Sequence, residues 1–529
     1  MKKSIIFLFI LAIATGCKRE PTSWNIDALY PIMHTQMTIQ QAIPDTMISV
    51  GERKELRFIY KGNLIQFSLD SLLSMPDTTI TDRFYLPIGS ITLQPGQVFL
   101  ADTNYNRYDL GGAKLTQIII QSGSMSLSLS STLQETSFME YSLPTASKNG
   151  IPFFVKEKIP AGSSTSPSVI NRTYDLSGYT ISMTGINNND YNIVSTAYRA
   201  YIDSNGAPTV ITPANQFVAT NTLASITPIY ARGSFGSEIS HLIESNVAID
   251  AFKNIAGGSI NLDSAVMTFQ IENEFGAEIS ITVNHITGNN TYNNTNVSLQ
   301  SPLSSGSINL NRATETNGAN SSPVATTFTT LLDNSNSNVA DFISNLPNEM
   351  SYDFDLHINP LGNVSNSNDF VYHNTGIAIN LDAEMPLKFN ASNLIIQDTS
   401  SFKIDSTSQA DAARIVGGYI NVHATNWYPF SVSTQFYLID KNNAIIDSIF
   451  DTPEIINGAL PIFGVVDNPV YSLLKAPISG TKIEHLYEAK NILTSVKINS
   501  TDSATIQILE PYFLDLKMIG DFTYKMEIK

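Results

Sequence analysis

The chain of 529 residues almost lacks cysteine, since Cys17 is the only one in it. No disulfide can form within the chain, and a lone exposed thiol would be a liability in an oxidising compartment. The residues before it explain its position. Lys2 and Lys3 precede nine apolar residues, 5–13, and small residues lead up to Cys17. A bilayer span needs roughly 20 apolar residues, so this shorter run predicts a cleaved secretory signal.

Charge is also scarce, and basic residues are scarcer than acidic ones. Charged residues make up 15% of the chain, with 30 Lys and Arg against 47 Asp and Glu and a net charge of -17. Nucleic-acid binding needs clustered Lys and Arg to contact phosphates. We therefore expect no nucleic-acid partner, and the polarity carried by Asn, Ser and Thr is typical of an extracytoplasmic β protein.

Sequence motifs of catalysis and metal binding are missing as well. The seven histidines are scattered, and the chain has no H-E-x-x-H, G-x-S-x-G, P-loop or G-x-G-x-x-G motif. Residues 102–112 begin like a calcium loop, but Arg107 stands where that loop needs glycine. We expect no metal, no cofactor and no enzymatic activity, although two carboxylates from distant strands could still form a hydrolase site.

Alternating apolar and polar residues run through most of the chain. Met125, Leu127 and Leu129 alternate with serines, which is the period-2 pattern of a half-buried strand. We predict a mostly β fold of several β-sandwich-like domains in series, with short capping helices near 237–255, 336–345 and 481–490. The predicted boundaries are 1–16 for a signal peptide, 17–112 for an anchor-proximal region, and 113–256, 257–390 and 391–529 for three β domains. The domain at 257–390 contains a polar loop rich in Asn, Ser and Thr.

Three alternating segments that end at asparagine suggest an internal repeat. They end at Asn187, Asn273 and Asn426, and each is followed by a short turn and a second alternating strand. The pattern resembles the late-embryogenesis-abundant type-2 (WHy) β-sandwich domains over about 25 residues per copy. Asn often ends strands, so independent strands remain an alternative.

The N-terminal region resembles bacterial lipoproteins. Ala14, Thr15, Gly16 and Cys17 are similar to a lipobox, and Trp24 to Asp27 together with "NEFGAEI" and "LPNEMSYDFDLHINP" resemble outer-membrane lipoproteins of the Bacteroidota. The resemblance implies that Cys17 is lipidated and begins the mature chain. It also implies anchoring in the outer membrane, on the periplasmic face or at the cell surface, and it brings no known activity with it.

O-glycosylation sites of such bacteria resemble Asp, then Ser or Thr, then a small or aliphatic residue. Six positions of this chain fit that pattern: Thr46, Ser71, Thr78, Ser264, Ser448 and Ser503. We predict glycan on them where the turn is exposed.

One aromatic cluster stands out because it falls on a turn. Trp427, Tyr428 and Phe430 place three rings within four residues, and successive strand side chains point to opposite faces. Either the turn buries the rings against a neighbouring domain, or they form a recognition tip for a protein or glycan partner.

Three functions remain open from the sequence. We favour a non-catalytic, lipid-anchored envelope protein that binds a protein or glycan partner, as a subunit of a larger outer-membrane or surface assembly. The alternative is a carrier of an apolar ligand that resembles the tubular lipid-binding proteins, and an enzyme is the third. A continuous apolar tunnel would favour the carrier, and a cleft with paired carboxylates would favour the enzyme.

Overall fold

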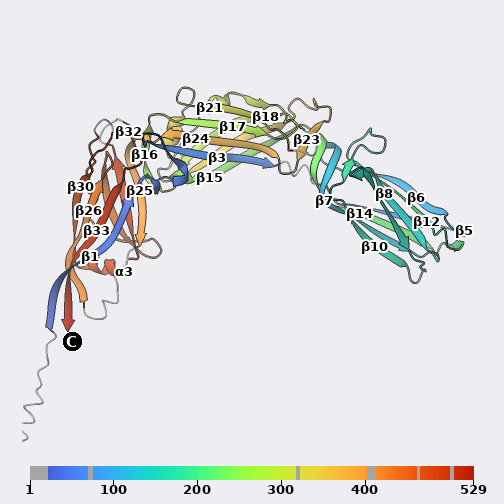
Figure 1. Ribbon diagram of the computed structural model, residues 1–529, viewed down its shortest axis with the longest axis horizontal. Helices are drawn as coiled ribbons and strands as arrows, with labels where there is room; N and C mark the ends of the chain where they lie inside the picture. Colours follow the sequence, from blue (N-terminus) through green and yellow to red (C-terminus); the bar gives the residue numbers. More distant parts are fainter. Residues whose placement is uncertain are drawn as a thin grey trace, which may run out of the picture.

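The structure is a computed structural model that describes residues 22–68, 75–316, 322–401, 404, 413–461, 465–500 and 505–528. Antiparallel strands make up most of it, so the predicted mostly β fold is confirmed. The strands form three modules along an arch (Figure 1). The terminal module contains both ends of the described chain, the middle module forms the top of the arch, and the distal module forms its other end.

The terminal module combines residues 22–44 with residues 388–528. Its eight main strands are β1 (Thr22–Met37), β25 (Lys388–Ser401), β26 (Ala413–Asn426), β27 (Ser431–Ile439), β28 (Ile445–Ser448), β30 (Val470–Ile478), β31 (Asn491–Asn499) and β33 (Leu514–Ile528). One sheet has the order β1-β33-β26-β30 and the other contains β25-β31-β27-β28. Short additional elements are β16 (Ile255–Leu262), β29 (Glu454–Ile456), β32 (Ile506–Gln507), η1 (Ile39–Gln41) and the helix α3 (Thr481–Glu488).

The middle module combines residues 45–68 with most of residues 238–386. Its eight main strands are β3 (Leu56–Ser68), β15 (Glu238–Ala248), β17 (Val266–Asn273), β18 (Ile279–Asn290), β19 (Thr295–Ser298), β21 (Thr326–Leu332), β22 (Glu349–Ile358) and β24 (Gly376–Pro386). One sheet contains β3-β24-β17-β21 and the other has the order β15-β22-β18-β19. Its short elements are β2 (Ile48–Val50), β20 (Ser307–Leu310), η2 (Asp45–Met47), η4 (Asp250–Phe252), η5 (Pro302–Ser305) and the helix α2 (Val339–Ser344).

The distal module spans residues 75–234 without interruption. Its eight main strands are β4 (Thr78–Tyr85), β6 (Val98–Arg107), β7 (Lys114–Ser131), β8 (Ser137–Lys148), β9 (Ile151–Ile159), β10 (Ser168–Asp175), β12 (Ile193–Ile202) and β14 (Gln216–Ser234). The short β11 (Thr180–Ser182) pairs with both β7 and β8 and joins the two halves into one sheet. Two further strands, β5 (Ile91–Leu93) and β13 (Thr209–Ile211), form a separate small sheet, and β23 (Asp369–Tyr372) adds to β14 from the middle module.

The three modules share one topology. If the eight main strands of each module are labelled A to H in chain order, every module pairs A with H, H with C and C with F. Every module also pairs B with G, G with D and D with E. Eight strands in two facing sheets with this order form a jelly roll. The chain is therefore built of three copies of one fold.

The copies are nested rather than placed in series. Between strands A and B of the terminal module, Met37 to Lys388, lies the whole middle module. Between strands A and B of the middle module, Ser68 to Glu238, lies the distal module. The structure thus differs from the serial boundaries expected at 112, 256 and 390. Residue 112 falls between two strands of one jelly roll, because strand pairing unites segments that are far apart in the sequence.

Buried asparagines confirm part of the internal repeat. At the end of strand C, Asn273 accepts a hydrogen bond from the Phe275 N–H at 3.0 Å and donates to the Ala277 and Asn311 carbonyls. Asn426 makes the same three bonds at the end of its own strand C, with Tyr428, Phe430 and Asn457. The fixed spacing of these bonds explains why the pattern was visible in the sequence.

The third copy predicted at Asn187 is wrong. Asn187 is exposed in the turn after β11 and does not end a strand C. The equivalent position in the distal module is Ser131, whose register partner Phe217 lies at the start of strand H. Ser131 Oγ accepts a hydrogen bond from the Leu133 N–H at 3.2 Å, as the Asn side chains do from the residue two places on. In the distal module a serine replaces the asparagine, so the asparagine pattern in the sequence does not include this third copy.

Two of the three predicted helices are present. Residues 339–344 and 481–488 are helical, but residues 237–255 form β15 and the short η4. Strand β15 lies at a sheet edge against β22, and most of its side chains are exposed. Because its apolar residues are not buried on one face, their spacing did not distinguish a strand from the predicted helix. The polar tract after β18 contains β19, η5 and β20 rather than one long loop.

Hydrogen bonds hold the modules together at both junctions. Between the terminal and middle modules, Leu56, Leu387 and Ile508 join through three backbone bonds of 2.8 to 3.0 Å. Between the middle and distal modules, the Glu315 carboxylate accepts from the hydroxyls of Tyr230 and Tyr372 and pairs with Arg232. We therefore expect a stiff arch rather than modules on flexible linkers.

Candidate functional site

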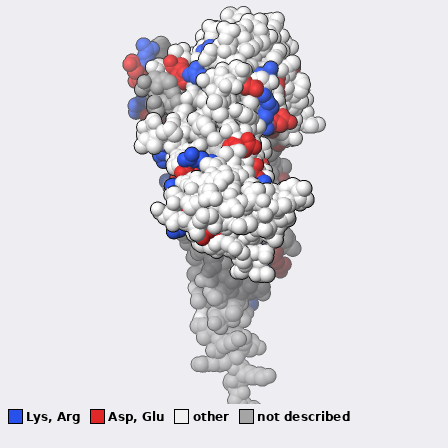
Figure 2. All heavy atoms as spheres, turned by 90° about the vertical axis from the view of Figure 1, so that its right-hand side faces the viewer, with Lys and Arg blue, Asp and Glu red and all other residues white. Residues whose placement is uncertain are grey.

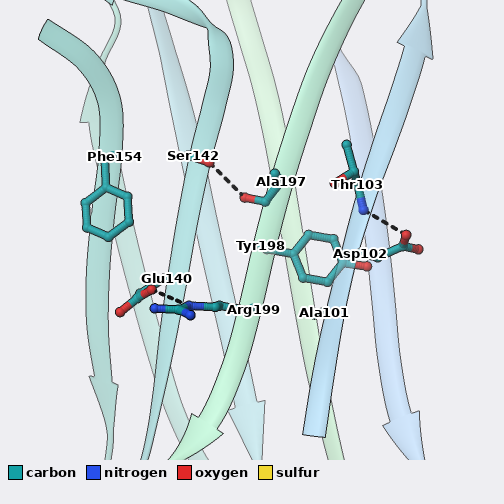
Figure 3. A pocket seen from close by; sticks show the side chains of 9 residues that line it. All are labelled: Ala101, Asp102, Thr103, Glu140, Ser142, Phe154, Ala197, Tyr198 and Arg199. Carbon is teal, nitrogen blue, oxygen red and sulfur yellow. Dashed lines mark hydrogen bonds and ion pairs between the residues drawn. The ribbon is translucent and has the colours of Figure 1, made fainter. Parts of the chain in front are cut away.

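The outer face of the distal module carries an open hollow of about 560 Å³ (Figure 3). It lies across four neighbouring strands, β6, β12, β8 and β9. The residues that line it are Ala101, Asp102, Thr103, Glu140, Ser142, Phe154, Ala197, Tyr198 and Arg199. Tyr198 is buried and belongs to the core below.

The floor of the hollow exists because small side chains fall into register. Ala197 pairs with Thr103 on one side and with Ser142 on the other, and Ser142 pairs with Phe154. Three small side chains in one row leave space above the sheet. Phe154 ends that row with a ring that is 58% exposed. The result is a shallow floor of mixed polarity beside an exposed apolar ring, and on this floor the Ser142 hydroxyl donates to the Ala197 carbonyl at 3.3 Å.

A row of charged side chains borders this floor. Arg199 Nε donates to Glu140 Oε2 at 2.6 Å, and Lys156 lies 3.7 Å from the other carboxylate oxygen. The Tyr201 hydroxyl donates to Glu140 as well, at 2.9 Å. The hydrogen bond from Arg199 holds the pKa of the Glu140 carboxyl below its usual value. Glu140 is therefore an ionised anchor that fixes the guanidinium of Arg199 beside the hollow.

Aromatic rings complete the outer face. Phe138 and Tyr201 stack with their centroids 5.8 Å apart, and Lys156 lies 4.8 Å from the centroid of Phe138. This cation–π contact fixes the lysine side chain next to the charged row. The hollow thus offers hydroxyl groups, a fixed guanidinium and an exposed ring. This combination suits a ligand with hydroxyls around an apolar face.

Among the described residues, small apolar cavities lie inside the other modules. One in the terminal module, beside Tyr428 and Phe430, and one in the middle module, beside Phe58, measure about 30 Å³ each. A cavity of this volume holds a water molecule or two, and an acyl chain is far larger. Neither of these two cavities is therefore large enough for an acyl chain, and the carrier function stays a hypothesis.

The aromatic cluster at residues 427–430 is packed into the terminal module. Tyr428 stacks on Phe430 at 5.4 Å, and both are buried. Burial also raises the pKa of the Tyr428 hydroxyl. Trp427 is half-buried, with its ring centroid 5.9 Å from that of Phe513, and its backbone N–H donates to the Phe513 carbonyl. Tyr428 and Phe430 are thus buried, but within their own module and not against a neighbouring domain as expected. Of the three rings, only Trp427 keeps an accessible part for a partner.

The predicted modification sites have different surroundings. Thr46 and Ser264 are exposed, whereas Thr78 and Ser448 are half-buried within strands. The Ser448 hydroxyl also donates to the Phe450 carbonyl at 2.9 Å. Cys17, Ser71 and Ser503 lie outside the described residues.

No group of three His, Cys, Asp or Glu residues in the described part of the chain could hold a metal ion. Within the same residues, no helix is long and apolar enough to cross a bilayer.

Comparisons with known proteins add little to this geometry. No family model matches the chain, and no curated protein matches it. A solved protein from Parabacteroides distasonis ATCC 8503, described as secreted, has 13% identity over 56% of this chain and 90% of its own, with a TM-score of 0.24. The VP2 subviral particle of infectious bursal disease virus has 8% identity over 87% of this chain and 83% of its own, with a TM-score of 0.10. These scores are too low to carry an argument about function.

The sequence did not predict the hollow as a site, although Asp102 begins the segment that resembles a calcium loop. Each strand contributes only one or two small residues to the hollow, such as Thr103 in β6, Ser142 in β8 and Ala197 in β12, so no single strand shows a sequence pattern that indicates a site. Only the register between three strands brings them together. The partners of these strands could not be read from local sequence.

Proposed function

We propose that the chain is a non-catalytic, lipid-anchored protein of the outer membrane that binds a glycan in the hollow of its distal module. The observation that carries the proposal is the hollow itself, with an exposed ring, hydroxyl groups on its floor and a fixed guanidinium. A sugar ring can lie with its apolar face on Phe154. Its hydroxyls can then accept from Arg199, donate to the Ser142 oxygen and exchange hydrogen bonds with Thr103.

The placement of the hollow supports the same function. The distal module lies at the opposite end of the arch from strand β1, which begins at Thr22 (Figure 1). Cys17, the residue we propose to be lipidated, precedes Thr22 by five positions. Anchoring there would hold the distal module away from the membrane, towards the periplasm or the cell exterior. A stiff arch would keep it there.

The electrostatics of the hollow favour binding over catalysis. A general acid needs a carboxyl whose pKa is raised towards the working pH. The pKa of Glu140 is instead lowered, and its two oxygens are held by Arg199, Lys156 and Tyr201. We therefore assign Glu140 a positioning role towards Arg199.

Glycan binding can be tested with the soluble Cys17→Ser chain on an array of peptidoglycan fragments and bacterial surface polysaccharides. The wild-type hollow should bind a defined glycan on that array. Phe154→Ala and Arg199→Ala should each weaken binding at least tenfold in calorimetry, through loss of stacking or of the guanidinium. The matched control is Tyr471→Ala, which removes an exposed ring from the terminal module and should leave affinity unchanged.

Two results would contradict the proposal. One is binding to no glycan on the array, and the other is binding that survives both substitutions in the hollow. Thermal melting of each variant separates loss of binding from loss of folding. Phe154 is exposed, so Phe154→Ala should melt like the parent. Arg199→Ala leaves Glu140 paired with Lys156 and Tyr201, so this variant should still fold.

A further inference from the structure

Four loops form the free end of the distal module. They are the connections A–B at 86–97, C–D at 132–136, E–F at 160–167 and G–H at 203–215. The strand register places them together. Phe217 pairs with both Phe84 and Ser131, and Ser137 pairs with both Ile159 and Ile202. We call this surface the end face.

The corresponding end of the other two jelly rolls is a packing surface. In the terminal module, Ile508 at this end bonds to Leu56 and Leu387, next to the first and last strands of the middle module. In the middle module, Phe275 at this end packs against Phe235 with ring centroids 5.1 Å apart. The chain thus uses the same end of this fold twice to dock another β module.

Within the part of the chain that the structure describes, no further module packs on the same end of the distal module. The A–B connection is short, and its strand β5 pairs with β13 to cover the core. Leu93 and Ile211 on this small sheet are buried. Outside them, Ile88 is 84% exposed and Val210 is 54% exposed. The small sheet thus covers the core, while Val210 on its outer side and Ile88 in the A–B connection remain exposed to solvent.

The end face is also poor in charge. Its four loops contain no Lys or Arg, and Glu135 and Asp203 are their only acidic residues, whereas 15% of the whole chain is charged. One oxygen of Asp203 is used within its own turn, where it accepts from the Asn205 N–H at 3.0 Å. Figure 2 looks onto this end of the molecule, where white surface predominates and charged side chains gather in a few clusters. Interface cores are depleted of charge in the same way.

We propose that the end face docks a second protein, end-on, through an apolar and uncharged surface of a β domain. The argument is continuity with the two junctions inside the chain, where the same end of the jelly roll meets a β module. Ile88 and Val210 would form the core of the contact, and the hydroxyl and amide groups of the loops would form its rim. The contact is separate from the hollow and does not depend on glycan binding.

Site-specific photo-crosslinking in the native host tests the proposal. A benzoylphenylalanine at position 88 should give one discrete adduct with a second protein. The matched control is position 460, because Leu460 in the terminal module is 86% exposed and should give no such adduct. Val210→Lys should reduce the adduct at position 88 at least tenfold, whereas Ile445→Lys on the terminal module should not. Phe154→Ala should leave the adduct intact, which separates this surface from the hollow.

The purified partner should then bind the wild-type chain and lose at least tenfold in affinity for the Ile88→Lys variant. Both Ile88 and Val210 are exposed, so their variants should melt like the parent. The proposal is overturned if position 88 gives no adduct, or the same adducts as position 460. An adduct made only of two copies of this chain would also overturn it, because the surface would then serve self-association.

Discussion

Replacing Asn426 with alanine tests the buried asparagine that links strands C and D. Its side chain is 0% exposed. Nδ2 donates to the Phe430 and Asn457 carbonyls at 3.1 and 3.0 Å, and Oδ1 accepts from the Tyr428 N–H at 2.9 Å. Asn426→Ala removes all three bonds and leaves three backbone groups without this partner inside the protein.

The magnitude follows from these three groups. A buried polar group left without a partner costs about 1–3 kcal/mol. Water can reach part of this turn as it relaxes, so we expect a loss of about 3 kcal/mol in the free energy of unfolding of the terminal module. Asn426→Asp should be no better. It keeps the bond from Tyr428 but turns a carboxylate oxygen towards two carbonyls.

Urea unfolding followed by tryptophan fluorescence is the suitable assay. Both tryptophans, Trp24 and Trp427, lie in the terminal module, so their emission reports on that module. The control is Asn187→Ala, which changes an exposed side chain and should stay within about 0.5 kcal/mol of the parent. A loss below about 1 kcal/mol for Asn426→Ala, or an equal loss for Asn187→Ala, would refute the reasoning from hydrogen bonds.

Three further predictions concern the anchor, the surface modification and the aromatic cluster. Cys17→Ser should release the chain from membranes into the soluble envelope fraction, and a variant that stays membrane-bound would contradict lipid anchoring. Mass spectrometry of the chain from its native host should find glycan first at the exposed Thr46 and Ser264, while modification confined to the half-buried sites would contradict the role of exposure. Trp427→Ala should lower stability by about 2 kcal/mol, less than the 3–5 kcal/mol typical of a fully buried ring, because Trp427 is half-buried against Phe513. Unchanged urea unfolding, followed by circular dichroism, would show that this ring contributes no packing.

Local sequence predicted strand type well because alternation is a local property. Met125, Leu127 and Leu129 follow the period-2 pattern, and all three are buried. Strand partners are a different matter. Strand β1 pairs with β33, so Thr22 lies opposite Ile528. The residue pattern of one strand does not predict which strand it pairs with. The nesting of the modules follows from such pairings, which is why serial domains were expected instead.

The candidate site was harder to predict than the fold for a related reason. Arg199 and Glu140 face each other only because β12 and β8 are neighbours in the stated register. Each residue alone reads as an ordinary exposed charge on an alternating strand. By contrast, Asn273 and Asn426 were found because each acts on residues within a few positions of itself. Contacts between residues a few positions apart can therefore be predicted from the sequence, whereas contacts between distant strands cannot.

The nesting has a mechanical consequence for an arm tethered near residue 22. The three A strands, β1, β3 and β4, come one after another at the start of the chain, within residues 22–85. A pull between the tether and the distal module would therefore run through this first segment. Each A strand is held along its length by strand H of its own module, while most other strands lie off the line of force. Tension from a bound partner would load three strand pairs and leave the remaining sheets almost unstressed.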